Sequence, residues 1–128
     1  KVPVILNVFD AYMGGANTFD LVVDVEEAFE QFCEMSFCHQ SQINEWLPWV
    51  SGQPLEKPYN LAEWTDHSRK RSEEFKTKFG IKAKGAIEVF TVTAWGSIPN
   101  YENLLDDFPN IITSASNLDG LKKKIKQF

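Results

Sequence analysis

The sequence predicts a mixed α/β domain in which helices are layered on strands, with few strands of its own. Short apolar runs rich in β-branched residues alternate with longer segments whose apolar residues recur at helical spacing. Capping residues stand in front of several of the helical segments. The chain has 128 residues, of which 43% are hydrophobic, with ten Phe, four Trp and three Tyr. This length corresponds to one domain or to half of a larger domain, so residues 1–128 are treated as a single domain or half-domain.

Four segments have the composition of strands. Residues 2–9 form a short apolar run rich in Val and Ile, and residues 19–24 form a second run. A turn at Gly14 and Gly15 is expected between them. Residues 86–93 give the strongest strand pattern, because β-branched residues dominate and glycines bound the run. Residues 110–113 are predicted as one further short strand.

Two long helices are expected in the middle of the chain. The first is predicted over residues 24–48, with Asp24 as N-cap, Glu27 at capping-box spacing and an end at Pro48. A loop follows at 51–58, where glycine and proline are frequent. The second helix is predicted over residues 60–80, with Asn60 and Glu63 as the capping pair and Gly80 just past the last turn.

Two shorter helices are expected in the last third. One is predicted from Asn100 to Asp107, ended by Pro109. The other is an amphipathic helix that Asn117 would cap.

Charge and hydropathy exclude several classes of protein. The net charge of −5 is spread along the chain, and the only dense basic run is formed by Lys122, Lys123, Lys124 and Lys126. A nucleic-acid partner would require a basic stripe, so none is expected. No apolar stretch reaches the length of a membrane span and no signal peptide is visible, so we expect no membrane partner and a cytoplasmic location. Cys33 and Cys38 are expected as reduced thiols.

The sequence offers no catalytic centre of its own. Only two histidines are present, and no His-x-x-Glu-His, Cys-x-x-Cys or His-Pro-Asp-Asp arrangement occurs. A catalytic zinc needs about three protein ligands. Cys33, Cys38 and His39 are close in sequence, but their spacing matches no standard metal site. We therefore expect no catalytic residue, no metal ligand and no cofactor in this chain.

Three polar residues stand at positions where a side chain could reach a pocket. His39 lies on the apolar stripe of the predicted 24–48 helix, as a hydrogen-bonded core histidine or at the edge of a site completed by other residues. Arg71 lies on the apolar stripe of the 60–80 helix, where an arginine usually extends to solvent or pairs with a carboxylate. Glu88 either faces solvent or is a buried carboxylate paired with a residue such as Arg71.

Trp46 and Trp49 flank Pro48 and are the aromatic candidates for ligand contact. Such a pair can stack on a sugar ring, although packing against a sheet is the more common role.

The segment that contains these residues resembles a known family. It is similar to the His-x-Ser-Gln helix of LmbE/PIG-L-type zinc-dependent N-deacetylases and the stretch that follows it. The residues that carry the similarity are Phe37-Cys38-His39-Gln40-Ser41-Gln42 and then Glu45-Trp46-Leu47-Pro48-Trp49. Four short upstream pieces are similar to the family's pair of strands that lead into that helix: Pro3-Val4-Ile5, Phe9-Asp10, Phe19-Asp20 and Val22-Val23-Asp24-Val25. Ala86-Ile87-Glu88-Val89-Phe90 resembles a late strand of the family, and Trp95-Gly96 and Phe108-Pro109 follow in the same order. The resemblance covers roughly residues 2–110.

The resemblance implies the C-terminal part of a Rossmann-like layered α/β hydrolase, LmbE-like, that removes the acetyl group of an N-acetylated amino sugar or similar conjugate. In that family zinc is held by an Ala-His-Pro-Asp-Asp motif and a His-Pro-Asp-His motif, neither of which is present here. Zinc is therefore implied for the intact enzyme, in an N-terminal half or chain that would be the partner of this one. The isolated chain is expected to be inactive, and the absence of an initial Met before Lys1 fits a fragment or processed product.

Three hypotheses remain open. The chain is half of a deacetylase, with homo-oligomer contacts as a further role; or it is a non-catalytic carbohydrate-binding module that holds a sugar against Trp46 and Trp49; or it is a subunit that docks on a separate zinc-bearing chain. His39, Trp46, Trp49, Arg71 and Glu88 are the substrate-pocket candidates.

Overall fold

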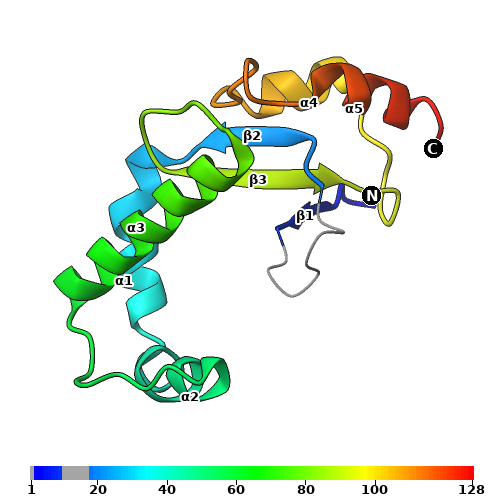
Figure 1. Ribbon diagram of the computed structural model, residues 1–128. Coiled ribbons are helices and arrows are strands. Elements are labelled where there is room, and N and C mark those ends of the chain that lie inside the picture. Colours follow the sequence, from blue (N-terminus) through cyan, green and yellow to red (C-terminus); the bar gives the residue numbers. More distant parts are fainter. Residues whose placement is uncertain (1, 10–17) are drawn as a thin grey trace. The chain divides into compact units, whose positions relative to one another are not determined.

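The computed structural model describes residues 2–9 and 18–128 (Figure 1). The expected turn at Gly14 and Gly15 lies outside the described residues. The chain forms two compact units, one made of residues 1–25 and 81–128 and the other of residues 26–80. Each unit is built from its own set of elements, and each is described separately below.

The first unit contains a three-stranded antiparallel sheet in the order β1-β3-β2. The strands are β1 (Leu6–Val8), β2 (Leu21–Asp24) and β3 (Ile87–Val92). Figure 1 shows β3 between the two others. In the register, Leu21 and Leu6 lie opposite Phe90 and Val92, respectively. The strands predicted at 19–24 and 86–93 are confirmed, and so is the mixed α/β class.

The predicted strand at 2–9 is shorter in the structure, because its first half leaves the sheet to meet the loop after β3. The Ser97 N–H donates to the Pro3 carbonyl at 2.9 Å, and the Thr93 N–H donates to the Ile5 carbonyl at 3.3 Å. The chain passes so close to Gly96 that a Cβ there would lie 2.1 Å from the Pro3 carbonyl oxygen. Only glycine allows this approach of two backbones.

The short strand predicted at 110–113 is reduced to one bridge between Val23 and Ile111. Two backbone hydrogen bonds support it, from the Asp24 N–H to the Asn110 carbonyl at 2.9 Å and from the Ile112 N–H to the Val22 carbonyl at 2.8 Å. The segment therefore occupies part of the free edge of β2, and its contact with that strand is one bridge long.

Helices α4 (Tyr101–Asp107) and α5 (Leu118–Ile125) cover one face of this sheet, as Figure 1 shows. Their N-caps are the predicted ones: the Asn100 side chain accepts the Asn103 N–H at 3.0 Å, and the Asn117 side chain accepts the Gly120 N–H at 3.1 Å. The core beneath them is made of side chains that are almost fully buried: Leu21, Val92, Leu104 and Leu121.

A buried carboxylate joins β2, β3 and α5. The Asp20 carboxylate accepts the Val92 N–H at 2.8 Å and the Lys124 ammonium at 2.7 Å, both on the same oxygen. Asp20 is 7% exposed. An ionised group at this depth requires such partners, since leaving it unpaired would cost several kcal/mol.

The second unit is helical and its first half differs from the prediction. A 3₁₀ turn, η2 (Glu26–Ala28), precedes α1 (Phe29–Phe37), and a π-helix, η3 (Gln42–Trp46), leads into α2 (Leu47–Ser51). The single helix predicted over 24–48 is therefore wrong at both ends and in its middle.

The structure departs from the predicted helix at three places. Asp24 ends strand β2, and the N-cap of α1 is Ala28, which makes no side-chain capping bond. The helical ladder stops at Cys38 and His39. Pro48 does not end a helix, because it stands in the first turn of α2, where a proline removes no helical hydrogen bond.

Helix α3 (Leu61–Phe79) follows the prediction closely. Asn60 and Glu63 form a reciprocal capping box, and Gly80 ends the helix with a φ of 65°. Figure 1 shows α1 and α3 running side by side. The Trp64 indole N–H donates to the Ser36 hydroxyl at 2.8 Å, which fixes the two helices against each other. In the described part of the chain, no helix is both long and apolar enough to cross a membrane.

Replacing Asp20 tests the buried carboxylate. We expect Asp20→Ala to lower the free energy of unfolding by about 3 kcal/mol, because it leaves a buried N–H and a half-buried ammonium without their partner. Urea unfolding at neutral pH measures this change. Asp106→Ala, on the exposed side of α4, is the control and should cost less than about 0.5 kcal/mol. Equal losses in the two variants would show that Asp20 has no special role.

Candidate functional site

A shallow pocket of about 370 Å³ opens on the second unit. Five residues line it, all from one continuous stretch that covers the end of the turn before η3, η3 itself and α2: Ser41, Gln42, Glu45, Trp46 and Trp49. The site is therefore local, and its shape depends on the helical geometry between residues 41 and 49.

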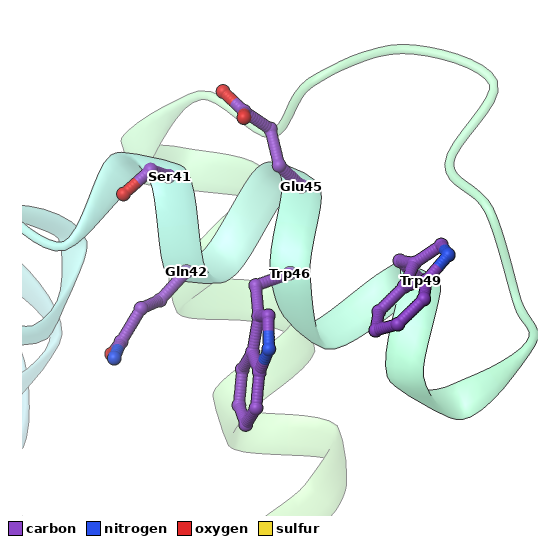
Figure 2. Close-up of a pocket in the computed structure, with 5 residues that line it drawn as sticks. All are labelled: Ser41, Gln42, Glu45, Trp46 and Trp49. Carbon is purple, nitrogen blue, oxygen red and sulfur yellow. The ribbon is translucent and has the colours of Figure 1, made fainter.

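Figure 2 shows how the lining side chains divide. Gln42 and Trp46 point to the same side of the helical segment, while Glu45 points to the opposite side. Trp49 stands one turn further along. The polar lining side chains thus stand on both sides of the helical segment, and the two indole rings belong to its later part.

The two tryptophans are unusually accessible. Trp46 is 51% exposed and Trp49 is 78% exposed. Large aromatic side chains are usually buried, and an exposed group of them commonly marks a binding surface. An indole face next to hydroxyl and amide groups can stack on the C–H face of a sugar while the polar groups bind its hydroxyls.

Buried neighbours explain why this segment presents its tryptophans outward. Ile43 is 5% exposed, and Pro48 is also buried. Since these two residues hold the inner side of the segment, Glu45, Trp46 and Leu47 between them are exposed. The π-helix adds one residue to the turn between them, a distortion that is frequent at functional sites.

The structure brings together two of the five predicted site residues, Trp46 and Trp49. His39 is exposed, so its predicted place on a buried stripe is wrong. The reason is that the helix ends at this point and the 3.6-residue periodicity does not continue through it. His39 does not line the pocket.

Arg71 and Glu88 belong to different units, on α3 and β3. Arg71 is exposed, as expected for an arginine that extends to solvent, and the buried residues of α3 are Trp64 and Lys76. Glu88 shares its sheet face with Phe90, as predicted, and is largely exposed. Even so, partial burial raises the pKa of the Glu88 carboxyl above its usual value.

Three lining residues were not predicted as site residues: Ser41, Gln42 and Glu45. They lie within the same Gln-Ser-Gln to Trp-Leu-Pro-Trp segment, so the local clustering of polar and aromatic residues was the available signal. Within residues 2–9 and 18–128, no group of three His, Cys, Asp or Glu side chains is placed to hold a metal ion.

A second aromatic group lies beside α3. The Trp64 and His67 rings are stacked with centroids 5.5 Å apart, and the Tyr59 hydroxyl lies 3.4 Å from Nδ1 of His67. Burial lowers the pKa of His67 below its usual value of 6.5, and the positive charge of Arg71 lowers it further. The folded unit therefore favours the neutral imidazole.

Comparison with known proteins gives no relative: no family model, no curated protein and no solved structure matches this chain.

The lowered pKa of His67 predicts how stability depends on pH. As the pH falls through about 6.5, the unfolded chain takes up a proton before the folded chain does, so the free energy of unfolding decreases until the pH is below the folded pKa. His67→Gln should reduce this decrease. Urea unfolding at pH 7.5 and 5.5 measures it. His39→Gln, at an exposed histidine, is the control, and an equal response in both variants would contradict the assignment.

Proposed function

We propose that this chain is the C-terminal part of a zinc-dependent N-deacetylase of the LmbE/PIG-L type, and that its pocket contacts the sugar part of an N-acetylated amino-sugar conjugate. One observation carries the proposal. All five pocket residues lie between Ser41 and Trp49, within the segment whose sequence resembles the His-x-Ser-Gln helix of that family. The resemblance concerns the order of residues in this segment, whereas the pocket is a property of its three-dimensional geometry.

The chemistry of the lining supports a sugar as ligand. Sugars present hydroxyls on their edges and C–H groups on their faces, so they need hydrogen-bonding groups next to a flat apolar surface. Ser41, Gln42 and Glu45 supply the former, and Trp46 and Trp49 supply the latter. No basic residue lines the pocket, which favours a neutral or cationic ligand over an anionic one.

Among residues 2–9 and 18–128, no group of three His, Cys, Asp or Glu side chains is placed to hold a zinc ion, so the proposal assigns no zinc ligand to these residues. In the proposed enzyme, zinc would be held by an N-terminal half or a separate partner chain, where it would polarise the amide carbonyl. The three-stranded sheet of the first unit would then extend a larger Rossmann-like layered domain. Homo-oligomer contacts and a cytoplasmic location belong to the same proposal.

A second candidate function is a non-catalytic carbohydrate-binding module. The exposure of Trp49, at 78%, favours it, because a ligand could reach the ring without any other polypeptide. The partner-docking alternative uses the same exposed surface for a separate zinc-bearing chain.

The first experiment measures sugar binding. We expect this protein to bind N-acetylglucosamine weakly, and Trp46→Ala or Trp49→Ala to weaken binding at least about fivefold, the loss of roughly 1 kcal/mol of stacking. Titration followed by NMR chemical shifts gives the Kd. Trp95→Ala is the matched control, because Trp95 is 81% exposed but belongs to the other unit. Loss of binding in Trp95→Ala alone, or no binding by the unmodified protein, would contradict the proposed pocket.

The second experiment separates the enzyme from the binding module. Intact mass and zinc content are measured together on the natural product. We expect a species roughly twice as long as this chain, or a complex with a second chain, that carries about one zinc ion. A stable product of this length without zinc or partner would contradict the deacetylase, and sugar binding in that product would favour the module.

A further inference from the structure

Three side-chain hydrogen bonds connect the end of α1, the π-helix and the start of α3. The Gln40 amide N–H donates to the Phe37 carbonyl at 2.8 Å. The Asn44 amide N–H donates to the Gln40 amide oxygen at 3.1 Å. The Tyr59 backbone N–H donates to the Asn44 amide oxygen at 2.8 Å. We call this chain of contacts the amide relay.

The relay satisfies backbone groups that helix ends leave open. Phe37 is the last residue of α1, and its carbonyl has no partner within that helix. Tyr59 directly precedes Asn60, the N-cap of α3. Gln40 therefore supplies a partner for a carbonyl that the end of α1 leaves open, and Asn44 fastens the loop before α3 to η3.

Asn44 occupies the centre of η3 and uses both ends of its amide in the relay. Only a side chain with one donor and one acceptor in this arrangement can do so. Because hydrogen bonds hold both ends of the Asn44 amide, the rotation of the π-helix at this residue is fixed as well. The directions of Gln42, Glu45 and Trp46, which lie on the same helical segment and line the pocket, are then fixed with it.

We propose that Gln40 and Asn44 are positioning residues of the pocket: they touch no ligand, and they set the direction of the side chains that do. The functional part of this inference rests on the proposed sugar binding. Its structural part concerns the π-helix alone and can be tested without a ligand.

The test uses substitutions that remove the relay in parts. Asn44→Leu removes both bonds of Asn44, and Asn44→Asp keeps the oxygen that accepts the Tyr59 N–H. Gln40→Ala removes the bond to the Phe37 carbonyl and the bond from the Asn44 amide, but leaves the bond between Asn44 and Tyr59. Gln53→Ala is the matched control, at an exposed residue of the following loop. Each variant is studied by amide hydrogen exchange without ligand, by titration with N-acetylglucosamine and by thermal unfolding.

We expect faster exchange of the Tyr59 amide in Asn44→Leu, by about fivefold to tenfold, the value of one hydrogen bond. Binding should weaken by a similar factor although the variant stays folded at the temperature of the titration. In Asn44→Asp the exchange rate of the Tyr59 amide should stay within about twofold of the rate in the unmodified protein, because the accepting oxygen remains. The Kd for N-acetylglucosamine should then return toward that of the unmodified protein. This rescue separates positioning from a general loss of stability.

Two results would overturn the inference. The first is that Asn44→Leu shows the same exchange rate of the Tyr59 amide and the same Kd as the control Gln53→Ala. The second is that Asn44→Asp loses as much binding as Asn44→Leu although its Tyr59 amide stays protected. If the unmodified protein binds no sugar, the proposed function fails, and the exchange of the Tyr59 amide still decides whether the relay holds the π-helix.

Discussion

The first unit depends on one buried carboxylate. Asp20 is the residue before β2, and its side chain reaches the backbone of β3 at Val92 and the ammonium of Lys124 on α5. Hydrophobic burial alone would hold α5 on the sheet, but it would not determine where along the sheet the helix lies. Hydrogen bonds from the residues just before α5 to β2 and its preceding residue fix one end of the helix: the Asn117 N–H donates to the Asp20 carbonyl at 2.9 Å, and the Ser116 hydroxyl accepts the Val22 N–H at 2.9 Å. The bond between Lys124 and the Asp20 carboxylate holds the helix at a second point, over the core leucines.

Sequence patterns predicted the elements whose signals are local. The capping box at Asn60 and Glu63, the glycine at 80 and the dense β-branched run of β3 are confirmed because each depends on a few neighbouring residues. The helix predicted over 24–48 is wrong because periodicity was read across a break. In the sequence, apolar residues continue at helical spacing through His39. In the structure, the backbone leaves the helix at this point and resumes it with an extra residue in the turn of η3.

The same error decided which site residues could be predicted. Trp46 and Trp49 were found because two tryptophans around a proline are conspicuous in any conformation. His39 was placed on a buried face by a helical projection that does not apply at that point. Glu45 was overlooked because an acidic residue within a helical pattern is ordinarily a solvated one. The contact between Asn44 and Tyr59 joins residues 15 positions apart, and no local rule predicts it.

The π-helix has a consequence for how this segment tolerates changes in length. A π-turn is equivalent to an α-turn with one residue inserted. Deleting one residue between Gln42 and Trp46 would restore ordinary α-helical hydrogen bonds, and the backbone itself would gain regularity. Because the extra residue is absorbed within that one turn, the side chains beyond the deletion, Trp49 included, would keep nearly the same direction around the helix axis. The change would fall on the turn itself, where one side chain fewer would share the surface that Gln42, Glu45 and Trp46 now line.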